Sequence, residues 1–275
     1  MLNIHRPLRA AVLCSHRAPG LLYLLNRSPD RGVTFEIVCV VTSEPTFEEE
    51  VRVERRGIPA IARPMRIFFE TRHASVFQDA ELRRAYDRET VAAIEPYLPD
   101  FVLLDGYRYL LTPEFLAAYS ARVVNLHFSD LTLRQPDGCP RLPGLRAVRD
   151  ALMAGYLETR ATVHLVNERP DEGPPLVRSW GFVVSPLVEA LRSQAPGDVM
   201  SAYTFAHQQW MMRTVSGPLM AAALRLIATG AVDLDAIAAS AAPPAPWQLE
   251  ADGGLYLPVN PEPGTRNLEP AEVLA

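Results

Sequence analysis

Short apolar runs alternate with amphipathic segments along the first half of the chain. Continuous apolar runs bounded by turn residues predict buried strands at 8–14, 35–42, 58–62, 101–104 and 122–126. Between them, helical segments are predicted over 21–25, 45–56 and 81–97, and Thr112-Pro113 is typical of the start of another short helix. Strands that alternate with helices indicate a parallel sheet, so we expect an α/β fold.

The second half has a less regular pattern. It predicts a loop over 132–141, a helix over 145–154, strands over 162–166 and 175–184, and two helices within 199–227 separated by a break at 216–218. Residues 65–77 read as irregular, either a surface loop or part of a substrate wall. We expect residues 1–235 to form one catalytic domain. Residues 236–275 would then supply an Ala/Pro linker, a short hairpin about Asp252-Gly253-Gly254, and a loose tail.

Composition narrows the function classes. A net charge of -5 over 275 residues argues against a nucleic-acid-binding surface. The chain contains no lysine, which excludes Schiff-base chemistry and a P-loop lysine. Cys14, Cys39 and Cys139 are too few and too scattered for a disulfide framework or a zinc site, and we expect no metal. No signal region or run of transmembrane length is present, so a cytoplasmic protein without a membrane partner is expected.

Candidate chemistry lies in the stretch 99–131. Asn125 and His127 are two apart at the end of a predicted strand, so both side chains leave the same face. An amide donor beside an imidazole can stabilise an oxyanion. Asp171, in a Pro/Gly loop, is the third candidate, although each of the three residues alone also has an ordinary structural interpretation.

The first turn of the chain offers a second candidate site. Residues 15–20 (SHRAPG) connect a predicted strand to a predicted helix, and such a helix N-terminus can hold an anion. His16 and Arg17 have the alternative interpretation of two solvated turn residues.

Seven short motifs in register resemble the glycinamide ribonucleotide formyltransferases. They are AYDRE at 85–89, PDFVLLDGY at 99–107, LTPEF at 111–115, VNLH at 124–127, PGL at 143–145, TVH at 162–164 and DEGP at 171–174. Their order and approximate spacing hold over about residues 81–184, and several motifs together are more specific than any one.

The resemblance implies a Rossmann-like, mostly parallel sheet flanked by helices, which binds no dinucleotide. It implies transfer of a formyl group from 10-formyltetrahydrofolate to a primary amine, such as glycinamide ribonucleotide in purine biosynthesis. By position, Asn125 and His127 would hold the oxygen of a tetrahedral intermediate, and Asp171 would orient the imidazole or a water and help move the proton. The pterin would lie against Leu104, Tyr109, Leu110, Leu111, Val166 and Asn167, largely through backbone groups, with His164 supporting the loop. The acceptor would lie near Ser15, His16, Arg17 and Gly144.

Three departures from the family pattern affect the expected acceptor site more than the donor site. Residues 128–132 (FSDLT) replace the usual Pro-Ser-Leu-Leu-Pro, and extra residues precede Pro143. The first turn is bulkier than the family's phosphate-cradling loop, and Pro19 removes one N–H donor. Pro170 and Glu172 replace the usual neighbours of Asp171. We therefore expect a remodelled acceptor pocket.

Several alternatives stay open. The same three residues could activate water and hydrolyse 10-formyltetrahydrofolate, although the known hydrolases carry an additional N-terminal domain and here the first predicted strand begins within ten residues of Met1. The acceptor could instead be an amino sugar or another amine. A non-enzymatic folate binder is disfavoured because Asn125, His127 and Asp171 are all present. Some relatives dimerise, so a homodimer is compatible with the resemblance.

Overall fold

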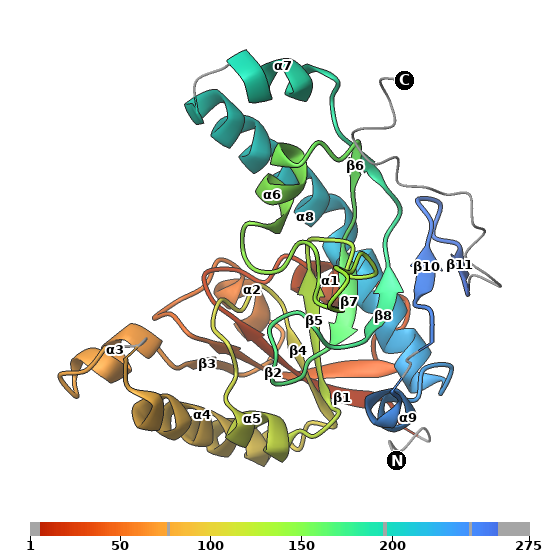
Figure 1. Cartoon of the computed structure of the whole chain (residues 1–275). Coiled ribbons are helices and arrows are strands. Elements are labelled where there is room, and N and C mark those ends of the chain that lie inside the picture. Colours follow the sequence, from red (N-terminus) through yellow and green to blue (C-terminus); the bar gives the residue numbers. More distant parts are fainter. Residues whose placement is uncertain (1–5, 76–77, 195–196, 242–243, 258–275) are drawn as a thin grey trace.

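A nine-stranded sheet forms the centre of the molecule (Figure 1). The computed structural model describes residues 6–75, 78–194, 197–241 and 244–257. The strand order is β11 (Leu255–Tyr256), β10 (Trp247–Leu249), β8 (Pro175–Arg178), β7 (Thr162–Leu165), β5 (Val123–His127), β4 (Phe101–Leu104), β1 (Leu8–Cys14), β2 (Phe35–Thr42) and β3 (Ala60–Ala62). Within this sheet β7 and β11 run opposite to the others. The predicted mostly parallel sheet is confirmed.

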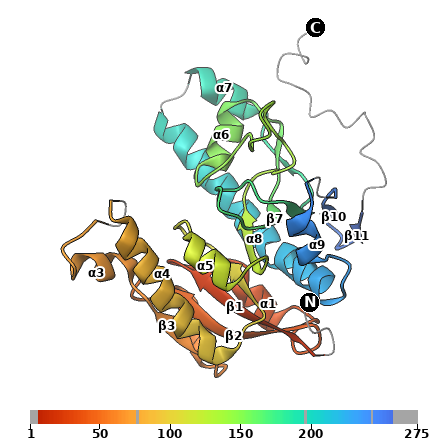
Figure 2. The ribbon, with the colours of Figure 1, turned by 60° about the horizontal axis from the view of Figure 1, so that its bottom comes forward.

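Helices cover both faces of the sheet (Figure 2). One face carries α4 (Ala80–Ile94), continued by a 3-10 turn over Glu95–Tyr97, and α5 (Pro113–Ala118). The other carries α1 (Leu21–Asn26) and α8 (Gly197–Ala228). The remaining helices are α2 (Glu50–Glu54), α3 (Met65–Glu70), α6 (Ala147–Met153), α7 (Leu187–Gln194) and α9 (Leu234–Ala239). A separate two-stranded sheet pairs β6 (Glu158–Thr159) with β9 (Phe182–Val183).

The alternation of side chains along β1 explains the two layers. Ala10 and Val12 pack with α1 and α8, whereas Ala11 and Leu13 pack with α4 and α5. Because a strand presents successive residues to opposite faces, a strand such as β1, which is apolar except for Arg9, needs a cover on each side. Cys14 and Cys39 belong to these two cores, as the sequence predicted. No helix of the described residues is long and apolar enough to cross a membrane.

The predicted break near residue 217 is wrong, because α8 is a single helix that contains Pro218. Gly217 is required there by packing: a Cβ at this position would lie 2.1 Å from the Cβ of Tyr23 in α1. The buried neighbours Ser216 and Leu219 tie this part of α8 to the core, which offsets the hydrogen bond that proline cannot donate.

Three further expectations need correction. Residues 65–70 form α3 and are not irregular, because Phe68 packs edge-on against Phe69 and against Tyr86 of α4. The strand predicted over 175–184 is split, and its second part, β9, belongs to the small sheet. The predicted hairpin is present, but it also extends the main sheet, because β10 pairs in parallel with β8. The predicted loose tail after Pro258 lies outside the described residues.

Asp105 joins the end of β4 to the start of α1. One of its carboxyl oxygens accepts the backbone N–H groups of Gly20 and Leu21, at 2.9 Å each. The other oxygen is buried without a hydrogen-bond partner among the described residues. Burial raises the pKa of Asp105 to about 8. The Asp105 carboxyl group therefore holds the turn before α1 in place, although this buries an ionisable group.

We predict that Asp105 makes the folded chain less stable as the pH rises. The folded chain keeps the proton to about pH 8, whereas the unfolded chain releases it near pH ~4. Unfolding therefore releases a proton between these values, and stability falls as pH increases through this window. Asp105→Asn keeps an oxygen for the two N–H groups and removes the titration.

Chemical denaturation at several pH values between 5 and 9 measures this effect. The free energy of unfolding should fall with pH more steeply for the native chain than for Asp105→Asn. A constant difference between the two proteins across the range would contradict the assignment.

Candidate active site

A cavity of about 650 Å³ opens at the carboxyl ends of β1, β4 and β5. Loops that follow these strands supply much of its lining, which is the usual place for a ligand in an open α/β sheet. The lining also includes residues from the loop after β7, the start of α6 and the middle of α8. The volume suits an extended small molecule.

The pairing of β5 with β7 places Asn125 directly opposite His164. The Nδ2 of Asn125 lies 3.0 Å from Nε2 of His164. The Nδ1 of His164 lies 3.1 Å from the carbonyl oxygen of Leu165, which can only accept, so Nδ1 carries the proton. Nε2 then accepts one N–H of the Asn125 amide. The second N–H of that amide remains available to a ligand.

His164 can accept the hydrogen bond from Asn125 because its ring stays uncharged. Its side chain is 2% exposed. Burial, with the neighbouring His127 as the next cause, lowers the pKa of His164 to about 4. At neutral pH its Nε2 is therefore an acceptor, which fixes the orientation of Asn125. His164 was expected to support the loop after β7; it contacts the start of that loop through the carbonyl oxygen of Leu165, and it also accepts from Asn125.

His127 lies between two acceptors. Its Nδ1 is 3.4 Å from Oδ1 of Asp171, and its Nε2 is 3.1 Å from the carbonyl oxygen of Leu142. A ring protonated on both nitrogens satisfies both neighbours, so this arrangement can stabilise imidazolium. The structure thus brings together the three residues, Asn125, His127 and Asp171, that the sequence singled out.

The backbone around Asp171 explains how a loop residue is held against His127. Asp171 has a left-handed backbone, with φ of 57°, a conformation that aspartate tolerates better than most residues. Its Oδ2 accepts the N–H of Gly144 at 2.7 Å. Two residues on, a Cβ at Gly173 would lie 1.8 Å from the carbonyl oxygen of Leu165, so this close approach requires glycine.

The other predicted site residues divide into two groups. All six residues expected at the pterin line the cavity: Leu104, Tyr109, Leu110, Leu111, Val166 and Asn167. His16, Arg17 and Gly144 line it as well. Ser15 does not; it is buried beneath the turn, where its Oγ lies 2.7 Å from that of Ser43 and accepts the N–H of Arg108 at 3.2 Å.

Sequence reasoning missed part of the lining. Glu48 is exposed and has no motif around it, Arg108 directly follows the motif at 99–107, and Gln208 and Met212 come from a segment predicted only to be helical. Leu145 ends the Pro-Gly-Leu motif and Ala147 and Val148 follow it, so these three could have been inferred from their closeness to Gly144 in the sequence. The α8 residues are too distant in sequence for such an inference.

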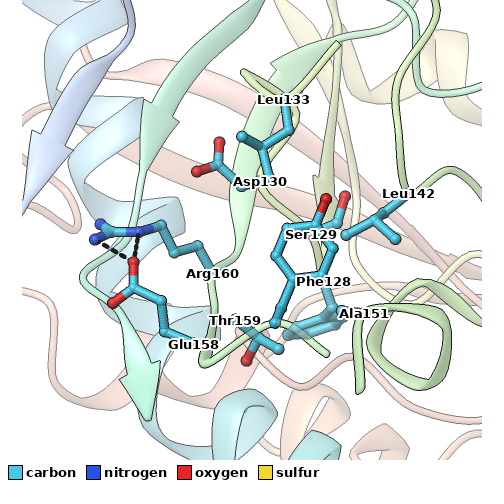
Figure 3. Close-up of a pocket in the computed structure, with 10 residues that line it drawn as sticks. Phe128, Ser129, Asp130, Leu133, Leu142, Ala151, Glu158, Thr159 and Arg160 are labelled. Atoms are coloured by element: carbon cyan, nitrogen blue, oxygen red, sulfur yellow. Dashed lines mark hydrogen bonds and ion pairs between the residues drawn. The ribbon is translucent and has the colours of Figure 1, made fainter. Parts of the chain in front are cut away.

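The segment after His127 is anchored by β8 and β10. Oδ2 of Asp130 accepts from Arg178 at 3.0 Å, and Nε of Arg178 donates to Gln248 at 2.9 Å. A cavity of about 20 Å³ lies behind this segment, between Phe128, Asp130 and the Glu158–Arg160 pair (Figure 3). It is about the size of one water molecule, so the substrates belong in the large cavity.

We predict that the His164 ring remains neutral, with its proton on Nδ1, from pH 8 down to about pH 4. Burial, with His127 as the next cause, outweighs the opposite effect of the Asp171 carboxylate 3.8 Å from Nε2 and prevents protonation at the usual pH. Nitrogen-15 NMR of the histidine rings distinguishes the two tautomers and gives the titration midpoint. A midpoint near pH ~6.5, or a proton on Nε2, would contradict the orientation assigned to Asn125.

Parts of the chain are similar to two proteins of Escherichia coli. Phosphoribosylglycinamide formyltransferase of Escherichia coli is 36% identical over 107 residues, 39% of this chain and 47% of that protein. Formyltetrahydrofolate deformylase of the same organism is 31% identical over 170 residues, 62% of this chain and 52% of that protein. The chain therefore spans about half the length of these curated relatives.

A solved structure supports the fold. The glycinamide ribonucleotide transformylase 1 of Symbiobacterium toebii superimposes with a TM-score of 0.61 at 24% identity, covering 82% of this chain and 89% of that one. The family model described as formyl transferase matches residues 8–215. That range contains β1 to β9 and the residues around the large cavity, from His16 to Met212. The chain belongs to the formyl transferase family.

Proposed function

We propose that the chain transfers the formyl group of 10-formyltetrahydrofolate to a primary amine. The observation that carries the proposal is the convergence of Asn125, His127 and Asp171 on one side of the large cavity. Attack on a formamide creates negative charge on one oxygen, and preorganised N–H donors stabilise that charge. One donor is the N–H of Asn125 that does not face His164, and the other is the Nε2–H of His127, which would exchange the carbonyl oxygen of Leu142 for the formyl oxygen.

The remaining steps move one proton. The amine nitrogen forms a bond to the formyl carbon, and the tetrahedral intermediate collapses when the bond from that carbon to N10 of the folate breaks. The proton lost by the amine ends on N10. Asp171, 3.4 Å from Nδ1 of His127, favours imidazolium while the oxyanion exists and can relay the proton.

The donor half of the cavity suits a flat pterin. Leu104, Leu111 and Val166 supply apolar surface, and the turn after β4 and the loop after β7 bring backbone polar groups to the same space. An apolar slot edged by backbone donors and acceptors is the usual form of such a site.

Hydrolysis of the same donor is the second candidate function. It is supported by the likeness to formyltetrahydrofolate deformylase, which extends over 62% of this chain. In that reaction water takes the place of the amine at the formyl carbon, and Asp171 would orient the water. The two functions use the same donor site and differ in the acceptor.

A turnover assay separates transfer from hydrolysis. It measures consumption of 10-formyltetrahydrofolate in amine-free buffer, with and without a mixture of primary amines that includes glycinamide ribonucleotide. Transfer requires the amine, so turnover should rise when the mixture is added. Equal turnover in both arms would make the chain a hydrolase. The absence of both turnover and folate binding would contradict the whole proposal.

We predict that His127→Ala lowers kcat by about a thousandfold, because the oxyanion loses a donor and the proton relay is broken. The Kd for folate should change by less than roughly threefold, a free-energy change below about 0.7 kcal/mol, since the pterin slot is built from other residues. Steady-state kinetics and fluorescence titration with folate measure the two quantities.

His73→Asn provides the matched control. His73 is exposed, lies outside the cavity lining and has a φ of 53°, which asparagine tolerates. This variant should keep native kcat and folate Kd. Near-native turnover in His127→Ala would show that the site has been assigned to the wrong residues.

A further inference from the structure

The turn between β1 and α1 has no backbone N–H left for a phosphate at residues 18–21. The N–H of Ala18 donates to Oε2 of Glu49 at 3.0 Å. Those of Gly20 and Leu21 donate to Asp105, and Pro19 has none. Phosphate groups in α/β proteins are commonly bound by such turns. In this chain, the carboxyl groups of Glu49 and Asp105 accept these hydrogen bonds, so the N–H groups are not available to a phosphate.

Side-chain charges beside the turn do not replace those donors. Arg17 donates to Oε1 of Gln209 in α8 at 3.1 Å. Burial raises the pKa of Glu49, and the nearby Arg17 only opposes this rise. The ring of His16 is 3.7 Å from Oε1 of Glu44. Glu48, exposed on the cavity lining, adds negative charge at the same place. A phosphate here would meet carboxylates at close range.

Arg108 is a further cation near this turn. Its backbone N–H is bound to Ser15, which places it beside His16 and Arg17, and its side chain is exposed on the lining. A single exposed guanidinium without backbone donors contributes little to binding an anion in water. The local charge therefore does not favour a phosphorylated ligand.

Several apolar side chains line the same cavity. Phe128 follows the catalytic His127, Ala147 and Val148 come from α6, and Met212 comes from α8. Leu145 also lines the cavity and is 68% exposed, which is unusual for a leucine beside a substrate site. Apolar surface left open within a cavity is typical of a site for an apolar group.

We propose that the acceptor amine carries an unphosphorylated, apolar substituent, which packs against Phe128, Leu145, Val148 and Met212. This inference rests on the proposed formyl transfer and names the class of its acceptor. Two independent observations carry it: the occupied N–H groups of the first turn and the apolar side chains that line the cavity. The formyl donor and the oxyanion site are the same for any acceptor of this class.

A series of glycinamides tests the proposal, because the reacting amine stays the same while the amide substituent changes. The series contains glycinamide ribonucleotide, its unphosphorylated nucleoside, glycinamide, and the N-methyl, N-butyl and N-benzyl amides. With 10-formyltetrahydrofolate as donor, kcat/KM should rise about fourfold for each methylene group added, from ~0.8 kcal/mol of burial per group. The nucleotide should be no better than its nucleoside, and millimolar inorganic phosphate should not inhibit.

Leu145→Asp tests the apolar lining directly. Its exposed side chain can be changed without disturbing the core, so the variant should fold and bind folate normally. We expect the ratio of kcat/KM for the N-benzyl amide to that for glycinamide to fall about tenfold. Leu187→Asp is the matched control: this leucine is 72% exposed at the start of α7 and outside the cavity, and the variant should behave as the native chain.

The outcomes separate this inference from the proposed function. Preference for the nucleotide over the nucleoside by more than about tenfold, or phosphate inhibition relieved in Arg108→Ala, would overturn the inference and leave formyl transfer intact. Formyl release as formate at a rate independent of every amide would overturn the amine acceptor itself. Failure to bind folate and to turn over any member of the series would contradict the proposed function as well.

Discussion

The antiparallel pairing of β5 with β7 is the interaction on which the site depends. The parallel part of the sheet ends at β5, and β7 runs back beside it, so that Asn125 faces His164 in register. A shift by one residue would turn both side chains to the other face of the sheet. The same reversal makes the loop after β7 leave near Asn125 and deliver Asp171 to His127. One strand pairing therefore positions all four polar groups of the site.

The buried polar groups around the β5–β7 pairing hold other side chains in position and do not react themselves. His164 remains neutral and holds Asn125, while Gly144 and the left-handed backbone at Asp171 hold the carboxylate. Asp105 and Glu49 play a comparable part at the first turn, where they satisfy backbone N–H groups. This use of carboxyl groups occupies the backbone N–H donors at one end of the cavity. In the proposed function, donor chemistry and acceptor choice would then depend on separate parts of the fold.

Much of the sheet and the central site could be predicted from the sequence. The apolar runs that became β1, β2 and β4 are buried on both faces and carry a strong signal, and Asn125 and His127 share a strand. The placement of Asp171 beside His127 depends on the path of the chain after β7, so the family resemblance was needed to associate them. The continuity of α8 through Pro218 depends on Gly217 packing against Tyr23, a contact between segments about 190 residues apart. Ser15 was expected at the acceptor, but no local pattern distinguishes a buried turn serine from an exposed one.

The measurement that tests the central claim most directly is the infrared stretching frequency of the formyl carbonyl in bound 10-formylfolate labelled with carbon-13. Two N–H donors at the oxygen lower this frequency by polarising the bond, whatever the acceptor is. The account predicts a lower frequency on binding to the native chain, with part of the shift lost in Asn125→Ala and part in His127→Ala. An identical frequency in the native chain and both variants, with folate bound in each, would show that Asn125 and His127 do not hold the formyl oxygen.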